Sequence, residues 1–281
     1  MLIVDSQVHI WAANTTERPW AKGNWSQAGQ PVFGKAELLE EMNKAGVERA
    51  VIVPPTLEGD RNELALDAVR SAPGRFAVMG RLDAESPSAR GKVLTLRQTP
   101  GMLGLRFNFR VKELQSVLRA GNMEWVWQEA EQAGVPVYVF VLHSLASLVD
   151  ALATRHPNLR ITLDHIGVHP HERDEQAYRD FDQFLALARH PNVAAKISAL
   201  PCTTADAFPY RKLDPYIRRA YDAFGPQRLF WGTDWTRMRF SASCSYRQAV
   251  TMFTEEIPWL TTEDKEWIMG RGVCAWLGWN L

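Results

Sequence analysis

The chain has 281 residues, of which 46% are hydrophobic and 23% are charged. This composition is typical of a folded globular protein with a large core and excludes a disordered or fibrous chain. The 32 lysines and arginines balance 32 aspartates and glutamates, so the sequence indicates no basic surface for nucleic acid or membrane and favours a small-molecule partner. No apolar run reaches the roughly 18 residues that a membrane-spanning helix needs.

The three cysteines, Cys202, Cys244 and Cys274, are widely spaced and form no C-x-x-C pair. This pattern argues against a disulfide framework and a zinc knuckle and is typical of a reducing compartment. The first residues also lack the basic and apolar segments of a signal peptide. We therefore expect a cytoplasmic protein, whereas nothing in the sequence indicates its oligomeric state.

Short runs rich in β-branched residues recur along the chain and predict eight strands, with helical patterns between them. An apolar stripe at spacing i, i+3, i+4 and i+7 starts at Leu145, and similar stripes start at Phe181 and Leu213. Glycine, proline and asparagine at the helix-to-strand joints end the helices. The expected strands lie at residues 2–9, 49–54, 75–82, 103–109, 136–142, 159–165, 193–199 and 228–234.

Strands that alternate with helices place the chain in the α/β class and predict a (β/α)8 TIM-type barrel that occupies residues 1–281 as one domain. Strands such as 136–142 are apolar without alternation, as expected when a parallel strand is covered on both faces. A doubly wound open sheet is the alternative, but the first turn lacks the G-x-G-x-x-G of that fold. The segments that follow strands are long, and the longest, 12–34, is expected to be a lid or pocket wall.

Polar residues at the carboxyl ends of barrel strands meet in one site, however far apart they are in sequence. Gln7 and His9 end the first strand, where alternation places them on one face, suited to a metal, a carbonyl or a carboxylate. Asp234 ends the last strand and suits a general base for water or a metal ligand, with a helix cap as the alternative. His165 ends the sixth strand and suits carbonyl polarisation or metal binding, whereas alternation turns Asp164 away and predicts a structural role.

Five further residues are candidates for substrate contact. Arg106 suits a forked contact with a substrate carboxylate or an internal ion pair. Lys196 suits an anion or a role as base, with pairing to a neighbouring acid as the alternative. His143 lies where the fifth strand meets its helix and is a candidate ligand, substrate contact or helix-start residue. Trp235 and Arg237 follow Asp234, and the arginine suits an acidic substrate or a solvated rim.

Several of these motifs together resemble the second amidohydrolase family, and most closely its lactonase branch, which includes 2-pyrone-4,6-dicarboxylate lactonase and sugar-acid lactonases. The resemblance extends from the first strand to the last helix. It implies a (β/α)8 barrel in which Asp234 activates water, His9 and His165 hold or polarise a lactone carbonyl, and Arg106 lies near a substrate carboxylate. The motifs are Asp5-Ser6-Gln7-Val8-His9-Ile10-Trp11, Gly80-Arg81-Leu82-Asp83, Gly104-Leu105-Arg106-Phe107, Leu163-Asp164-His165-Ile166-Gly167 and Trp231-Gly232-Thr233-Asp234-Trp235.

The sequence departs from the family pattern in the first strand, where the usual H-x-H is Gln7-Val8-His9. Glutamine is a weak zinc ligand, although its amide can donate to a carbonyl oxygen and accept from water. We therefore expect a hydrolase without an obligatory metal or other cofactor that opens a lactone of a small, carboxylated organic acid. Asp234 would deprotonate water, and His9 with Gln7 or His165 would stabilise the oxyanion.

Two alternatives stay open at this point. The first is a zinc-dependent decarboxylase or amide hydrolase that uses His9, His143 or His165, and Asp234. The second is a non-catalytic barrel that binds a small acid and whose site has decayed at Gln7. The sequence does not indicate which lactone or acid is bound.

Overall fold

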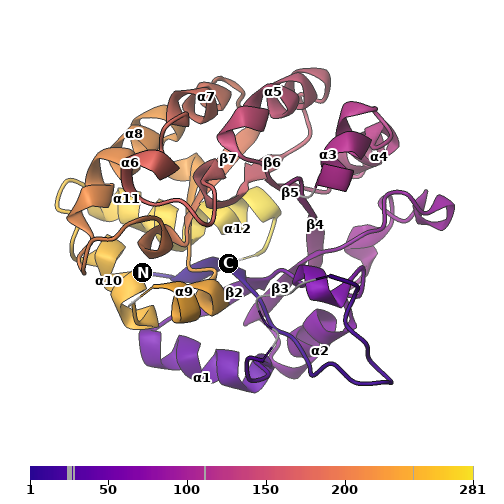
Figure 1. Cartoon of the computed structure of the whole chain (residues 1–281), viewed down its shortest axis with the longest axis horizontal. Coiled ribbons are helices and arrows are strands. Elements are labelled where there is room, and N and C mark those ends of the chain that lie inside the picture. Colours follow the sequence, from indigo (N-terminus) through magenta and orange to yellow (C-terminus); the bar gives the residue numbers. More distant parts are fainter. Residues whose placement is uncertain (24–26, 28, 111, 243, 281) are drawn as a thin grey trace.

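The computed structural model describes residues 1–23, 27, 29–110, 112–242 and 244–280. All eight expected strands are present and pair in parallel in the order β1 to β8, with the helices arranged around them (Figure 1). This arrangement confirms the (β/α)8 barrel. The strands are β1 (Val4–Val8), β2 (Arg49–Ile52), β3 (Phe76–Gly80), β4 (Met102–Asn108), β5 (Val137–Phe140), β6 (Ile161–Leu163), β7 (Val193–Ser198) and β8 (Leu229–Gly232).

The helices present their apolar stripes to the outside of the barrel. Val149 and Leu152 of α5 and Ile217 and Ala220 of α8 are buried, as the spacing of the sequence predicts. Within the described residues no helix is long and apolar enough to cross a membrane. The helices are α1 (Lys35–Ala45), α2 (Glu63–Ser71), α3 (Lys112–Arg119), α4 (Glu124–Gln132), α5 (Ala146–Arg155), α6 (Asp174–Ala177), α7 (Phe181–Leu185), α8 (Asp214–Phe224), α9 (Trp235–Ser241), α10 (Tyr246–Thr254), α11 (Thr262–Glu266) and α12 (Gly272–Leu277).

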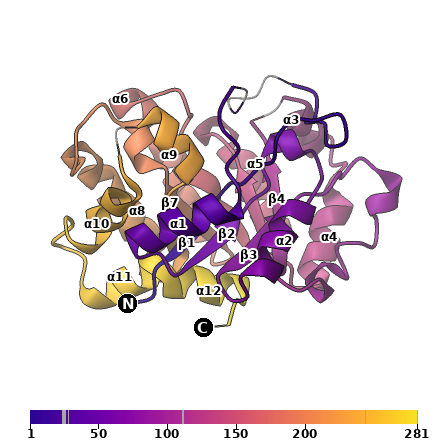
Figure 2. The ribbon, with the colours of Figure 1, turned by 90° about the horizontal axis from the view of Figure 1, so that it is seen from below.

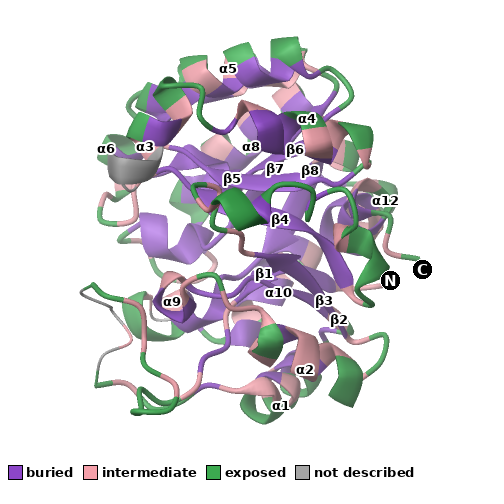
Figure 3. Cartoon of the chain, turned by 90° about the vertical axis from the view of Figure 1, so that its right-hand side faces the viewer, coloured by how far each residue is buried: buried purple, intermediate pink, exposed green. Residues whose placement is uncertain are grey.

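The strands are buried on both faces, because one apolar cluster fills the barrel and another lies between strands and helices. In β5, Tyr138 belongs to the inner cluster, whereas Val137 and Val139 belong to the outer one. Figure 3 shows the strands as buried and the exposed residues mainly on the outer helices and loops. Double burial explains why such strands are apolar without alternation.

The two ends of the barrel differ. Both termini lie at one end, where α12 contributes Val273 and Leu277 to the inner cluster (Figure 2). The loop after β1 reaches the opposite end, and its two ends are held together by the Trp11 N–H, which donates to the Phe33 carbonyl at 2.9 Å. The carboxyl ends of the strands and their long following segments therefore share one face.

The barrel closes between β1 and β8 through a buried carboxylate. No ladder register joins these two strands among the described residues; instead, Asp5 Oδ1 accepts from the Gln7 N–H at 3.0 Å and the Thr233 N–H at 2.9 Å. Asp5 Oδ2 accepts from the hydroxyls of Thr233 and Tyr246. The Asp234 N–H also donates to the Gln7 carbonyl at 2.9 Å. We call these contacts the β1–β8 seam.

Burial raises the pKa of Asp5 to about 6, even though its hydrogen bonds with Thr233, Tyr246 and Gln7 favour the carboxylate. The unfolded chain, with the ordinary pKa of 3.8, therefore loses this proton first. The contribution of Asp5 to stability is complete below about pH 4 and falls as the pH rises to about 6.

Asp5→Ala is expected to lower the free energy of unfolding by at least about 2 kcal/mol, because it leaves two buried N–H groups without an acceptor. Asp5→Asn keeps an acceptor oxygen for them and should cost much less, while it removes the pH dependence between about pH 4 and pH 6. Urea denaturation of both variants across this range measures the difference. Equal losses of unfolding free energy in the two variants would show that Asp5 does not act as the hydrogen-bond acceptor of the β1–β8 seam.

Candidate active site

A cavity of about 410 Å³ opens at the carboxyl ends of the strands. Its volume suits a small-molecule ligand. The segments after the strands build its walls, and Gln27 and Gln30 place the loop 12–34 among them; residues 24–26 and 28 of that loop lie outside the described residues. The residues at the strand ends that line the cavity are Gln7, His9, Arg106, Asn108, Arg110, Phe140, His165 and Asp234.

Two of these residues leave their strands through left-handed backbone turns. His165 has φ 54° and Asp234 has φ 50°, and Ile166 follows with φ 44°. Such angles are uncommon outside glycine and cost energy, most of all for a β-branched residue. Each strand also ends one or two residues earlier than the sequence predicts, so His9, His165 and Asp234 lie just beyond the strands.

These turns overturn the expectation that Asp164 faces away from the barrel interior. β6 ends at Leu163, so strand alternation does not apply to the next two residues. Asp164 is fully buried and pairs with Arg106 on β4 and Lys196 on β7, while His165 lines the cavity. Both side chains therefore belong to the interior.

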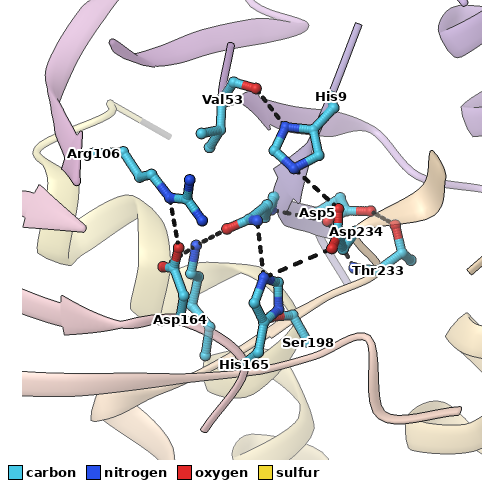
Figure 4. Close-up of polar contacts among 11 residues, drawn as sticks. Asp5, His9, Val53, Arg106, Asp164, His165, Ser198, Thr233 and Asp234 are labelled. Carbon is cyan, nitrogen blue, oxygen red and sulfur yellow. Dashed lines mark hydrogen bonds and ion pairs between the residues drawn. The ribbon is translucent and has the colours of Figure 1, made fainter. Parts of the chain in front are cut away.

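Asp234 and His9 form a close pair at the floor of the cavity (Figure 4). His9 Nε2 lies 3.1 Å from Asp234 Oδ1, and His9 Nδ1 lies 2.6 Å from the Val53 carbonyl oxygen. Because both nitrogens face oxygen acceptors, the contacts suit the imidazolium form, which carries a proton on each nitrogen. Asp234 is therefore one half of a buried ion pair.

Asp234 Oδ1 has no hydrogen-bond partner within the described part of the chain, and His9 contacts it as an ion pair. Burial would raise the pKa of Asp234, but the charge of His9 outweighs it and holds the pKa well below its ordinary value. Asp234 also occupies the cap position of α9 without a side-chain cap bond. Its side chain is thus ionised and can accept a hydrogen bond from a donor in the cavity.

His165 is held in one tautomer by its neighbours. Lys196 contacts Gln7 Oε1, and an ammonium can only donate, so the Gln7 amide nitrogen must face His165 Nε2 at 3.1 Å. His165 Nε2 therefore accepts, and Nδ1 donates to Ser198 Oγ at 2.7 Å. Burial lowers the pKa of His165 to about 3. In this neutral form Nε2 has no proton, which does not fit the expectation that His165 polarises a carbonyl.

Lys196 is fully buried and is not among the residues that line the cavity, which favours the alternative of pairing with a neighbouring acid over contact with substrate. Its Nζ lies 2.7 Å from Asp164 Oδ1, and Arg106 Nε donates to Asp164 Oδ2 at 3.0 Å. Burial lowers the pKa of Lys196 to about 8 and opposes ionisation of Asp164, but the charges of Lys196 and Arg106 hold the pKa of Asp164 below its ordinary value. The three groups form an internal ion network.

Three guanidinium groups, from Arg106, Arg110 and Arg237, line the cavity. Of these, only Arg106 has an ion pair within the described residues, and Arg237 donates to the Pro170 carbonyl at 3.0 Å. Burial, together with the charges of Arg106 and Arg237, lowers the pKa of Arg110 to about 10. Positive charge therefore accumulates in the cavity, where a bound anion would relieve it.

The sequence reasoning missed Arg110, although a signal was present. Arg106, Asn108 and Arg110 alternate with Phe107 and Phe109, which belong to the outer cluster. Residues that alternate along a strand share a face, so the same alternation that turns the phenylalanines outward turns the polar residues inward. The guanidinium carbons of Arg106 and Arg110 also lie 5.8 and 4.7 Å from the Phe140 ring centroid.

Two other candidates, His143 and Trp235, are not among the residues that line this cavity, and their contact with substrate stays a prediction. His143 Nε2 donates to the Ile166 carbonyl at 2.8 Å, and its ring packs against Phe181 and Phe184. Trp235 is buried and stacks on Tyr246, with ring centroids 4.8 Å apart. Both residues support the walls of the site from behind.

The donor atoms of this site do not fit a divalent metal. Gln7 Oε1 accepts from Lys196, and His165 Nε2 accepts from Gln7, so neither lone pair is available. Within the described residues, no three or more histidine, cysteine, aspartate or glutamate side chains are grouped so as to hold a metal ion. A zinc site would need histidine, thiolate or carboxylate donors in a tetrahedral arrangement.

The chain is similar to known proteins over most of its length. A model of the amidohydrolase family matches residues 4–271. The L-fucono-1,5-lactonase of Burkholderia ambifaria is 29% identical over 253 residues, which cover 85% of this chain and 81% of that protein. The 4-sulfomuconolactone hydrolase of Hydrogenophaga intermedia is 28% identical over 238 residues, 82% of this chain and 73% of that protein. A crystal structure of a Burkholderia multivorans amidohydrolase with bound zinc has a TM-score of 0.82, 22% identity and 99% coverage of both chains, and so shares the fold.

The neutral state of His165 predicts a pH dependence of stability. Its pKa of about 3 lies below the ordinary 6.5, so the unfolded chain takes up a proton that the folded chain does not, and stability falls as the pH drops below 6.5. Between pH 7 and pH 5 this loss is about 2 kcal/mol. Urea denaturation of the wild type and His165→Gln should show their difference in stability shrinking by that amount. A constant difference would mean that His165 is protonated in the folded state.

Proposed function

The chain belongs to the amidohydrolase family, and from this premise we propose that it is a hydrolase that opens a lactone of a small organic acid. The observation that carries the proposal is Asp234, whose ionised carboxylate lies in a cavity beside His9 and has one oxygen without a hydrogen-bond partner among the described residues. Two relatives that each match more than four fifths of this chain are named as lactone hydrolases. The geometry of the cavity and the similarity to these two hydrolases therefore support the same reaction.

In the proposed mechanism, Asp234 acts as the general base. A water that donates to Oδ1 is activated for attack on the lactone carbonyl carbon, and its proton passes to the carboxylate. The paired His9 keeps Asp234 a weak base in the resting site. When the substrate carbonyl accepts a hydrogen bond from His9 Nε2, the electrostatic hold of His9 on Asp234 weakens, and Asp234 becomes a stronger base at the moment of attack.

His9 and Gln7 stabilise the negative charge that develops on the carbonyl oxygen. His9 Nδ1 is fixed to the Val53 carbonyl, which leaves Nε2–H as the donor toward the cavity. The Gln7 amide nitrogen carries a second N–H besides the one donated to His165. Donors that are already in position need no reorganisation as the charge forms. The intermediate then collapses: the ring C–O bond breaks, and the departing oxygen takes the proton from Asp234.

The arginines support an acidic substrate, and preferably one with two anionic groups. Arg110 and Arg237 lack an acidic partner within the described residues, while Arg106 is already paired with Asp164. Guanidinium groups bind carboxylate and sulfonate oxygens through charge-assisted hydrogen bonds. A neutral lactone would leave this positive charge uncompensated. We further propose that hydrolysis needs no metal, which the occupied donor atoms support, and that the protein acts in the cytoplasm, which its three free cysteines support.

The activity itself is tested by a screen of sugar lactones, pyrones and muconolactones, each with and without a chelator. We expect hydrolysis of at least one acidic lactone at a rate that the chelator does not change. Turnover that is lost on chelation and restored by zinc would favour a zinc-dependent hydrolase. Thermal stabilisation by small acids without turnover of any lactone would instead indicate a binding protein.

With the best substrate of that screen, Asp234→Asn should lower kcat by several orders of magnitude, because the amide cannot accept the water proton. The circular dichroism spectrum should stay unchanged. Asp222→Asn, an exposed position on α8, is the matched control and should keep wild-type kcat. Near-normal turnover by Asp234→Asn would show that Asp234 is not the general base.

Arg110→Met tests the substrate charge, since it keeps the length of the side chain and removes the guanidinium. Loss of one charge-assisted hydrogen bond, worth about 1.5–3 kcal/mol, should raise KM roughly 10-fold to 100-fold for a lactone with two acidic groups. A neutral lactone should show no such rise. Arg70→Met, on the exposed face of α2, is the control. A similar change for neutral and acidic lactones would argue against anion recognition by Arg110.

A further inference from the structure

Lys196 is a fully buried cation close to the site that does not contact the cavity. Its ammonium has three neighbours: Asp164 Oδ1 at 2.7 Å, the Tyr138 ring centroid at 3.8 Å, and Gln7 Oε1. Figure 4 shows Asp164 and Arg106 on one side of the site and His165 with Asp234 on the other. Gln7 bridges the two sides, because its oxygen faces Lys196 and its nitrogen faces His165.

We propose that Lys196 is a positioning residue that, through the amide of Gln7, fixes the tautomer of His165 and keeps a divalent metal out of the site. The inference concerns the same cavity as the proposed function. It does not depend on the identity of the lactone, since both of its consequences are measured without turnover.

The first step of the argument is the orientation of the Gln7 amide. A 180° turn of this amide would bring its NH2 group against the Lys196 ammonium, where two donors would face each other in a buried setting. An unsatisfied buried donor costs about 1–3 kcal/mol, and more beside a charge. The lysine therefore selects one of two amide orientations that are equal in shape.

The second step concerns His165. With the amide N–H directed at Nε2, this nitrogen must accept. The proton therefore stays on Nδ1, which donates a hydrogen bond to Ser198 Oγ. Hydrogen bonds made by one ring nitrogen are known to fix the state of the other. Both nitrogens of His165 are thus engaged, and neither lone pair is free for a metal.

The third step is electrostatic. Lys196 and Arg106 share the single carboxylate of Asp164, so this part of the interior already holds an excess of positive charge. Two further positive charges added nearby, in a region of low dielectric, would be strongly repelled.

Zinc binding tests this proposal with a set of variants. Gln7→His restores a nitrogen donor, but with Lys196 in place it should gain little zinc after dialysis, measured by elemental analysis and calorimetry. Gln7→His with Lys196→Met, which removes the cation at similar side-chain length, should bind zinc at least roughly tenfold more tightly than Gln7→His. Equal affinity of the single and double variants would show that Lys196 plays no part.

The tautomer test uses the lysine-containing chain and so does not depend on whether Lys196→Met folds. Long-range ¹H–¹⁵N correlation spectra of ¹⁵N-histidine-labelled protein should show His165 protonated at Nδ1 only, with its signals assigned from their loss in His165→Gln. In Gln7→Glu one carboxylate oxygen faces Lys196 and the other faces His165, so Nε2 should become protonated. A wild-type His165 protonated at Nε2, or no change in Gln7→Glu, would overturn the proposal.

These outcomes separate the inference from the proposed function. If no lactone is hydrolysed but zinc exclusion and the tautomer are as expected, the role of Lys196 stands and the proposed reaction fails. If lactone hydrolysis is independent of metal but Gln7→His alone binds zinc as tightly as the double variant, the reaction stands and the role of Lys196 fails.

Discussion

The carboxylate of Asp5 is the contact on which both the barrel and its site depend. It accepts hydrogen bonds from Gln7, Thr233 and Tyr246, and so joins the first strand to the last without a ladder. His9 lies two residues after Gln7 and Asp234 directly follows Thr233, and their side chains meet in the cavity. Closing the barrel and assembling the acid–base pair are therefore the same structural event, and this accounts for a charged group kept at full burial against its desolvation cost.

Beneath and above the Gln7 amide, the buried charges form two separate groups. Lys196 and Arg106 neutralise Asp164 in the lower group, and His9 neutralises Asp234 in the upper one. Buried ion pairs seldom add net stability, because removing each ion from water costs several kcal/mol. Their effect here is on arrangement: Lys196 fixes the hydrogen-bonding direction of the Gln7 amide, and through it that of His165. His165, which is neutral, is thereby held in the tautomer that carries its proton on Nδ1.

The sequence predicted the barrel well because its signals are local: the apolar stripes of α5 and α8 and the eight β-branched runs each require only neighbouring residues. It failed where backbone geometry departs from the strand, since the left-handed turn at His165 brings both Asp164 and His165 to the interior, although alternation places them on opposite faces. Arg110 was missed despite a usable pattern. The tautomer of His165 lay beyond any pattern, because it depends on Lys196, which is 31 residues later in the chain, and on Gln7, which is 158 residues earlier.

Residue 7 has two separate roles, one carried by its backbone and the other by its side chain. Its peptide N–H and carbonyl belong to the β1–β8 seam, and these bonds are the same whichever amino acid is present. Its side chain alone carries the contacts with Lys196 and His165. A lineage can therefore replace the residue here by a single substitution and exchange one kind of reactivity for another while the barrel stays closed. New chemistry in this fold can arise with the least loss of stability at positions of this kind, because backbone hydrogen bonds hold the barrel closed and the side chain can vary.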